Sequence, residues 1–396
     1  MYIEDIAFNE ESFLYLERYV NDGSPSGFTD IYTVSEHTSP FCLDKGFDLY
    51  SLQQKSGDTI IEYGNKPDFF KWNMLIHPDM YGVVKDRFVN KQALYVSPTS
   101  SSRTVKCLEN PNWYLKLAYK GLIGRIDRTI GERQALSSVE VSSMIEKAID
   151  KNILSKSFYF LREPFAKIIR RNDDVWGIIL RETMPYPYNS DIKFQIPAFA
   201  LFSKDRHNPD HPSILKQLIL RNKVDIENYL LTSIIFPIYD SYFSLLLNCG
   251  LQLECHAQNT LFAIDKNFNV IGVISKDAES IDKDIFLMES FGIHHDIESL
   301  DYKCLNKTDY NYQIMHSFMF DFKLGEYLIS PIINEASKHF KINSQYIQEQ
   351  IQRHNRYYIG QLPPDFFPKE WYYYENIVHD RTKKRPYIYQ DTPKYR

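Results

Sequence analysis

The chain has 396 residues, of which 43% are hydrophobic, and carries a formal net charge of -5. That length exceeds what one small core requires, so two or three packed lobes are expected. The acidic balance excludes a general nucleic-acid binder, which needs a basic surface. Tyr and Phe are abundant, at 29 and 26 residues, and the polar tip of Tyr suits wet clefts and interfaces as well as core.

The cysteines and the apolar runs indicate in which cellular compartment the protein is expected. The 5 cysteines are scattered and lack CxxC spacing, which is typical of reduced thiols in a cytoplasm and of no zinc site. Residues 1–5 have neither a basic nor an apolar region, so no signal peptide is expected. The longest apolar run, near 229–247, is interrupted by Thr232, Pro237 and Asp240, which predicts a buried helix rather than a membrane span. We therefore expect a cytoplasmic protein with no membrane partner.

The first half of the chain predicts a short helix, a loop and then mainly strands. The expected elements are a helix at 10–19, a loop at 21–27, strands at 59–63, 93–96 and 113–119, a helix at 139–152, and a strand pair at 158–162 and 175–182. A turn centred on Asn110 and Pro111 would join the strand at 113–119 to residues 98–105. That register places Lys116 on the same sheet face as Arg103, about two residues along.

The second half turns helical after a linker at 186–190. A helix is expected at 213–222, and a longer one at 226–249 begins at the N-cap Asp225 and ends at Gly250. Further helices are expected at 312–340 and 344–354, followed by an irregular, aromatic-rich tail from Pro363.

A hairpin directly after the long helix carries unusual polar residues. Two apolar runs, at 251–264 and 270–277, flank a five-residue polar turn. If the first run is one strand, Glu254, His256 and Gln258 share a face and Asn259 lies on the other. A turn centred on Asn267 and Phe268 would set Gln258 opposite Asp277. Isolated polar residues in a strand are most often solvated, but this concentration favours a functional site.

A second set of polar residues gathers between 98 and 128. Hydroxyls and fixed cations are the groups that a polyphosphate needs, although a solvated basic surface would have the same composition. No P-loop motif is present. Across from this set, Glu254 and Asp277 are oxygen ligands suited to Mg²⁺, and His256 could bind a carboxylate or carry a proton. The set comprises Thr99, Ser100, Ser101, Ser102, Arg103, Lys116, Arg125 and Arg128.

Together these residues resemble the synthetases of siderophore biosynthesis that work independently of nonribosomal peptide synthetases, the aerobactin-synthetase-like family. The family's Pro-Thr-Ser-Ser-x-Arg-Thr is matched by 98–104, and its Lys-Leu strand followed by Arg is matched by Lys116, Leu117 and Arg128. Its Glu-x-His-x-Gln-Asn is matched by 254–259, and its basic-Asp pair by 276–277. The order and spacing of four motifs make the resemblance specific over about 37–285.

The resemblance implies ATP-dependent activation of a carboxylate, often citrate, as an acyl-adenylate that an amine or alcohol then attacks. It implies that ATP and Mg²⁺ are bound in a cleft, with Glu254 and Asp277 on the metal and Arg125 beside the substrate. His256, Arg128 and Lys116 would be catalytic, the first two by holding the carboxylate. The implied nucleotide ligands are Ser101, Ser102, Arg103, Lys116, Gln258, Asn259 and Asp277.

The implied fold is α+β and multi-lobed, with antiparallel sheets forming the ATP cleft and a helical C-terminal part. Its regions would be a shortened N-terminal region at 1–90, a β-rich nucleotide-binding lobe at 91–185, a palm-like lobe at 186–300 and a helical region at 301–396. A homodimer is possible. The family's His-Pro-x-His-Pro-x-x-Lys stretch is only echoed, by 37–40 and Lys45, and Gly124 stands where a threonine is frequent.

Two other functions fit part of the pattern. A kinase-like phosphotransferase would explain Lys116 and the His256-x-x-Asn259 spacing before Asp277, but Gln258 stands where the catalytic Asp belongs and no Asp-Phe-Gly follows. A homologue that binds nucleotide or carboxylate without turnover would also need the hairpin residues. The nucleotide product distinguishes the three.

Overall fold

The computed structural model describes residues 1–21, 34–84, 93–123, 126–222, 225–309, 312–369, 371–375 and 387–396. A short turn at Ile3–Asp5 leads into helix α1 (Glu10–Tyr19), which has the predicted bounds. The helix begins there because the Asn9 side chain accepts the Ser12 N–H at 3.0 Å, which satisfies a donor that the helix itself leaves free.

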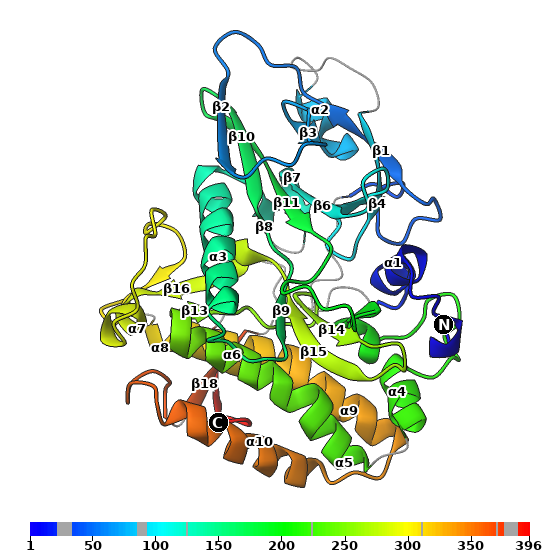
Figure 1. Cartoon of the computed structure of the whole chain (residues 1–396), viewed down its shortest axis with the longest axis vertical. Coiled ribbons are helices and arrows are strands. Elements are labelled where there is room, and N and C mark those ends of the chain that lie inside the picture. The colour runs from blue at the N-terminus through cyan, green and yellow to red at the C-terminus, as the bar shows by residue number, and fades with distance from the viewer. Residues whose placement is uncertain are drawn as a thin grey trace.

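An eight-stranded antiparallel sheet forms the upper lobe of the molecule (Figure 1). Its strand order is β2-β10-β11-β6-β5-β4-β1-β3, and a separate two-stranded ribbon, β7 and β8, follows β6. The bounds are β1 (Phe47–Ser51), β2 (Thr59–Gly64), β3 (Leu75–Ile76), β4 (Leu94–Pro98), β5 (Thr104–Cys107), β6 (Trp113–Leu117), β7 (Tyr119–Ile123), β8 (Ile126–Arg128), β10 (Phe165–Arg171) and β11 (Asp174–Glu182), with the short helix α2 (Tyr81–Val84) after β3.

Helix α3 (Glu132–Asp150) joins the upper lobe to the rest of the molecule (Figure 1). The protein has two hydrophobic cores, one in the upper lobe and one below it. The first turns of α3 pack on the upper core through Ala135, whereas Val141 and Ile145 belong to the lower core. The helix begins seven residues before the predicted start. The Gln134 side chain accepts the Gly131 N–H at 3.1 Å and so defines the N-terminus. The prediction missed these turns because serines, which are weak helix formers, blur the pattern there.

A four-stranded sheet, ordered β12-β14-β15-β9, lies below the upper lobe. Its strands are β9 (Phe158–Phe160), β12 (Phe194–Pro197), β14 (Thr260–Ile264) and β15 (Val270–Ser275). The predicted pairing of 158–162 with 175–182 is wrong, because β9 runs parallel to β15 while β11 pairs with β10. The chain leaves one sheet and enters the other around Pro164, and a proline has no N–H with which to continue a ladder.

The long helix predicted at 226–249 is continuous. It comprises α5 (Ile226–Tyr229), a π-helical stretch (Leu230–Ile235) and α6 (Phe236–Cys249). The Asp225 carboxylate caps its start by accepting the Asn228 N–H at 2.7 Å, and Gly250 ends it at φ 63°. In the described part of the chain it is the one helix long and apolar enough to cross a membrane, but 61% of that apolar window is buried inside the protein. Burial to this extent is typical of a helix in a protein core.

Leu246 on α6 tests whether this helix is a structural scaffold. Its side chain is 0% exposed, so Leu246→Ala is expected to lower the free energy of unfolding by about 2–5 kcal/mol through lost burial and a new cavity. Leu220→Ala on helix α4 (Ile214–Asn222) is the control, since Leu220 is 56% exposed and should change stability by less than about 0.5 kcal/mol. Urea unfolding measures both. Equal effects would place Leu246 outside the core.

The C-terminal part is mainly helical. One continuous helix comprises α8 (Tyr312–Ser317), a π-helical stretch (Phe318–Ile329) and α9 (Ser330–His339), close to the predicted 312–340. Helix α10 (Ser344–Ile359) follows it and begins as predicted, but it ends five residues beyond the predicted 354. The expectation of an irregular tail is wrong, because its aromatic residues form an antiparallel pair, β18 (Trp371–Glu375) and β19 (Tyr387–Asp391). The protein is therefore a mixed α/β chain with a large antiparallel sheet, a smaller sheet that includes the parallel pair β9 and β15, and a helical C-terminal part. The four predicted region boundaries stay a prediction.

Candidate functional site

The polar half of the hairpin is a turn rather than a strand. The first run divides into β13 (Leu251–Gln252), which pairs with β16 (Asp282–Asp284), and β14, and residues 253–259 turn between them. The predicted alternation of faces is therefore wrong. The predicted register is confirmed: Thr260 pairs with Ser275, and the Lys276 N–H donates to the Asn259 carbonyl at 3.0 Å. Continued by two residues, this register sets Gln258 opposite Asp277.

His256 is held in this turn in one protonation state. Its Nδ1 accepts the backbone N–H groups of Gln258 and Asn259, at 3.1 and 3.3 Å. Its Nε2 lies 3.8 Å from the Glu254 carboxylate. Burial lowers the pKa of His256 to about 4, although the Glu254 charge opposes that shift. At neutral pH the ring is therefore neutral and carries its proton on Nε2, where it can donate one hydrogen bond.

Glu254 is ionised and engaged. Burial acts to raise its pKa, but the charge of Lys323 at 3.2 Å, with smaller effects from His256 and Lys303, brings the pKa down to about 2. The Asn259 amide also donates to Glu254, at 3.4 Å. Lys323 lies in the C-terminal helices, so the site draws residues from distant parts of the chain. The sequence offered no signal for Lys323 or Lys303.

Asp277 lies at the centre of the site. It follows β15 at φ 78°, a left-handed conformation that Asp and Asn tolerate better than other non-glycine residues. Its carboxylate accepts from Lys116 and, at 2.9 Å, from Arg181. Burial acts to raise its pKa, but Lys116, Arg181 and Arg103 together hold it well below the ordinary range. The convergence of Arg103, Lys116 and Asp277 that the sequence predicted is therefore present.

Two neighbours complete what we term the ion-pair cluster: Arg103, Lys116, Arg181, Asp277 and Glu279. Glu279 accepts from Lys116 at 2.9 Å and faces Arg103 at 3.7 Å. Arg181 on β11 also donates through Nε to the fully buried Glu163 at 2.7 Å. Sequence reasoning missed Arg181 and Glu279. The Asp-x-Glu spacing at 277–279 was a possible signal for Glu279, whereas nothing marked Arg181.

The serine-rich segment forms the turn between β4 and β5. The Ser101 hydroxyl accepts the Thr104 N–H at 3.0 Å, and Thr99 donates to the Thr104 carbonyl at 2.6 Å. Ser102 has φ 64°, and the hydroxyl oxygens of Ser100 and Ser102 are buried without a hydrogen-bond partner among the described residues. Buried polar atoms of this kind are uncommon in proteins and favour a ligand or water at the turn.

Helix α1 ties this turn to the hairpin. Its Glu17, 1% exposed, accepts the Ser100 N–H at 3.1 Å and the Lys276 ammonium at 3.0 Å. The predicted register of β5 against β6 is off by one residue, since Lys116 pairs with Thr104. Arg103 nevertheless reaches Glu279. It precedes Thr104, the first residue of β5, so its side chain does not have to follow the alternation of faces along that strand.

Of the two arginines predicted to hold the carboxylate, the structure describes Arg128 but not Arg125. Arg128 is half-buried on β8, donates to the Ile123 carbonyl at 3.1 Å, and its own carbonyl accepts from Arg103 at 2.9 Å. It therefore lies beside the ion-pair cluster. Arg125 and Gly124 lie outside the described residues. The roles assigned to all the predicted site residues stay predictions.

Among the described residues, the stretch that echoes the family's first motif makes no hydrogen bond or ion pair with the cluster. His37 is exposed, and the Lys45 side chain is 81% exposed, 3.8 Å from Glu11. Thr38 is buried and donates to Asp79 at 3.0 Å, which also accepts from Tyr119. This stretch therefore anchors the N-terminal segment on the upper lobe.

The carboxylates of the site do not form a preorganised metal cage. Among the described residues, no group of three or more His, Cys, Asp or Glu side chains is arranged to hold a metal ion. Glu254, Asp277 and Glu279 are all paired with cations. Mg²⁺ is usually held by one or two carboxylates together with substrate phosphates, and the donors here fit that mode of binding.

A pH dependence of stability follows from Glu279. Burial acts to raise its pKa, but Lys116 and Arg103 lower it to about 2, against 4.5 for the free group. Ionised Glu279 therefore stabilises the folded state fully above pH 4.5, and this contribution is lost as the pH falls toward 2. The stability difference between wild type and Glu279→Gln should shrink by about 2 kcal/mol from pH 5 to pH 3, measured by urea unfolding. A pH-independent difference would contradict it.

Comparisons with known proteins agree with this architecture. Residues 72–203 match the model of the IucA/IucC family.

The petrobactin biosynthesis protein AsbB of Bacillus anthracis has the same fold, with a TM-score of 0.74 and 14% identity over 97% of this chain and 75% of that one. ATP-bound aerobactin synthetase IucA of Klebsiella pneumoniae matches with a TM-score of 0.68 and 12% identity, over 96% and 78% of the two chains. Aerobactin synthetase IucC of Klebsiella pneumoniae matches with a TM-score of 0.64 and 15% identity, over 89% and 73%. No curated protein sequence matches the chain. Residues 72–203 therefore resemble the IucA/IucC family in sequence, and nearly the whole chain shares the fold of these synthetases.

Proposed function

We propose that this protein is a cytoplasmic, ATP-dependent siderophore synthetase that joins a carboxylate to an amine or alcohol. The observation that carries the proposal is the ion-pair cluster. Three cations that are 8% exposed or less, Arg103, Lys116 and Arg181, meet two carboxylates beside a turn with unpartnered serine hydroxyls. Fixed cations next to free hydroxyls suit a polyphosphate.

The proposed first step is attack of a substrate carboxylate oxygen on the α-phosphorus of ATP. A P–O bond forms to the carboxylate, and the bond to the β-phosphate oxygen breaks, which releases pyrophosphate. A carboxylate is already ionised at pH 7, so the step requires orientation and charge neutralisation rather than a general base. Lys116 and Arg103 would exchange their carboxylate partners for phosphate oxygens. Mg²⁺, held by Asp277 and Glu254 with the phosphates, would supply further charge neutralisation.

The proposed second step is attack of an amine or alcohol on the acyl carbon of the adenylate, with AMP as the leaving group. His256 and Arg128 would hold the carboxylate substrate. A neutral His256 with its proton on Nε2 supports this role, because it offers a single donor without repelling a nearby cation. Arg128 can grip a carboxylate with two hydrogen bonds. We propose citrate or a related di- or tricarboxylate as the class of substrate.

A non-catalytic homologue is the second candidate, because His37 is exposed and Lys45 lies beside Glu11, with no contact to the cluster among the described residues. A hydroxylamine-trapping screen tests both candidates. ATP and Mg²⁺ are supplied with a panel of di- and tricarboxylates, and the nucleotide products are identified. AMP and pyrophosphate that appear only with a particular carboxylate support the synthetase. ADP would indicate a phosphotransferase, and no product over the whole panel would indicate a binding protein.

A further inference from the structure

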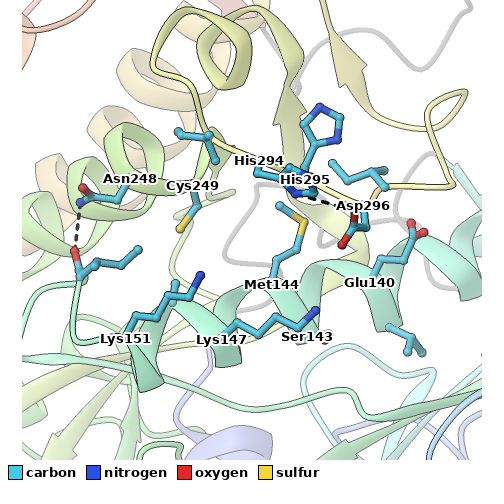
Figure 2. Close-up of a pocket in the computed structure, with 15 residues that line it drawn as sticks. Glu140, Ser143, Met144, Lys147, Lys151, Asn248, Cys249, His294, His295 and Asp296 are labelled. Carbon is cyan, nitrogen blue, oxygen red and sulfur yellow. Dashed lines mark hydrogen bonds and ion pairs between the residues drawn. The ribbon is translucent and has the colours of Figure 1, made fainter.

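A pocket separate from the ion-pair cluster lies on the other side of α3. It has a volume of about 620 Å³, is open to solvent, and is lined by α3, the C-terminal end of α6 and residues 293–297 (Figure 2). The volume lies within the range of small-molecule sites, about 300–1,000 Å³. None of the residues that line it belongs to the cluster or to the hairpin turn.

The interior of the pocket is apolar. Met144 and Ala148 lie one helical turn apart on α3, and Cys249 on α6 and Ile297 in the 293–297 segment also line the pocket. Ala148, Cys249 and Ile297 are 4%, 5% and 7% exposed. This wall can bury the hydrocarbon part of a ligand.

The two carboxylates at the rim are directed away from the apolar interior. Glu140 accepts the backbone N–H groups of Glu298 and Ser299, at 2.7 and 3.2 Å. The Asp296 side chain is 85% exposed and lies 3.8 Å from the equally exposed His294 ring, so water screens its charge.

The lysines of the pocket have no such partner. Lys147 in the last turn of α3 and Lys151 at its C-cap line the pocket, and their side chains make no hydrogen bond or ion pair within the described part of the chain. Burial raises the pKa of the Cys249 thiol to about 12, and the nearby Lys151 charge opposes that shift. The two lysine side chains are therefore cations that a ligand can pair with, close to the apolar wall of the pocket.

We propose that this pocket binds an organic anion, a carboxylate with an apolar body. The body rests on Met144, Ala148 and Ile297, and the carboxylate pairs with Lys147 and Lys151. A carboxylate with a hydrocarbon chain is favoured over a free phosphate because the pocket offers apolar area and no arginine fork. The opposite face of α3 carries Ser138 and Ser142, which bind Glu163, the carboxylate partner of Arg181, so the two sites use different faces of one helix.

Isothermal titration with octanoate tests the proposal, with octanol and octylammonium as comparison ligands. Octanoate is expected to bind saturably to the wild type, octanol more weakly, and octylammonium not at all. The double variant Lys147→Gln/Lys151→Gln should bind octanoate about five- to tenfold more weakly, since each exposed ion pair contributes little alone. Lys156→Gln, an exposed lysine outside the pocket, is the matched control and should bind as the wild type does. Ser143→Phe, which fills the pocket and keeps both lysines, should abolish binding.

Saturating ATP and the Arg128→Ala variant separate this site from the carboxylate site of the proposed function. Octanoate affinity should be unchanged by either. The proposal is overturned if octanoate does not saturate, if the lysine variant binds like the wild type, if octylammonium binds equally, or if ATP displaces octanoate. A thermal midpoint confirms that each variant is folded, and the lysine variant changes only exposed side chains. All of these measurements report binding or folding, so they can be made even if the protein has no synthetase activity.

Discussion

Replacing Lys116 by glutamine is expected to lower carboxylate-dependent pyrophosphate release by about 10²–10³-fold, the usual cost of removing one preorganised charge-stabilising group. Lys116 is 2% exposed and contacts both Asp277 and Glu279. The substitution leaves two buried carboxylates facing each other with less compensation. The free energy of unfolding should therefore also fall, by about 3–5 kcal/mol, as for a broken buried ion pair.

Lys120→Gln provides the matched comparison. Lys120 lies in the same lobe and pairs with Asp174, but its side chain is 29% exposed. Its removal should change stability by less than about 1 kcal/mol and leave pyrophosphate release unchanged. Steady-state pyrophosphate assays at saturating ATP, together with urea unfolding, measure both variants. If Lys116→Gln keeps full activity, the cluster is only structural and the nucleotide lies elsewhere.

The second large effect concerns the division of roles around the cluster. Arg103→Ala is expected to weaken ATP binding by about 10- to 100-fold, the loss of one or two charge-assisted hydrogen bonds. His256→Ala and Arg128→Ala should bind ATP nearly as the wild type does, yet lose carboxylate-dependent pyrophosphate release. The reason is that a neutral imidazole and an arginine fork suit a carboxylate, whereas the phosphates require the buried cations.

Asp277→Asn refines this test. Asparagine keeps the left-handed backbone at φ 78°, so the variant removes charge without adding strain. It should weaken ATP binding when Mg²⁺ is present. Without Mg²⁺ it should strengthen binding slightly, because Lys116 and Arg181 lose their carboxylate partner. Isothermal titration of ATP into each variant, with and without Mg²⁺, measures these changes in affinity. Loss of ATP binding in His256→Ala as severe as in Arg103→Ala would assign the imidazole to the phosphates.

Local patterns determined much of the fold. The caps Asn9 and Asp225, and Gly250 at the helix end, act within one helical turn, so the bounds of α1 and of the 226–249 helix could be predicted. The hairpin register of β14 and β15 followed from the turn alone. Predictions failed where distant packing decided the outcome. The strand at 158–160 pairs with β15, more than a hundred residues away, and no local pattern encodes that partner.

The candidate site divides in the same way. Residue types and spacing by themselves determined the family resemblance and the approach of Arg103 and Lys116 to Asp277. Only the tertiary structure decided how these charges are balanced. Arg181, Glu279, Lys323 and Glu17 come from separate elements and meet their partners at 2.9–3.2 Å. The face-alternation rule failed for 253–259 because these residues leave the strand to form a turn. Charge balance and protonation depend on burial and on neighbours in space, which a linear pattern does not record.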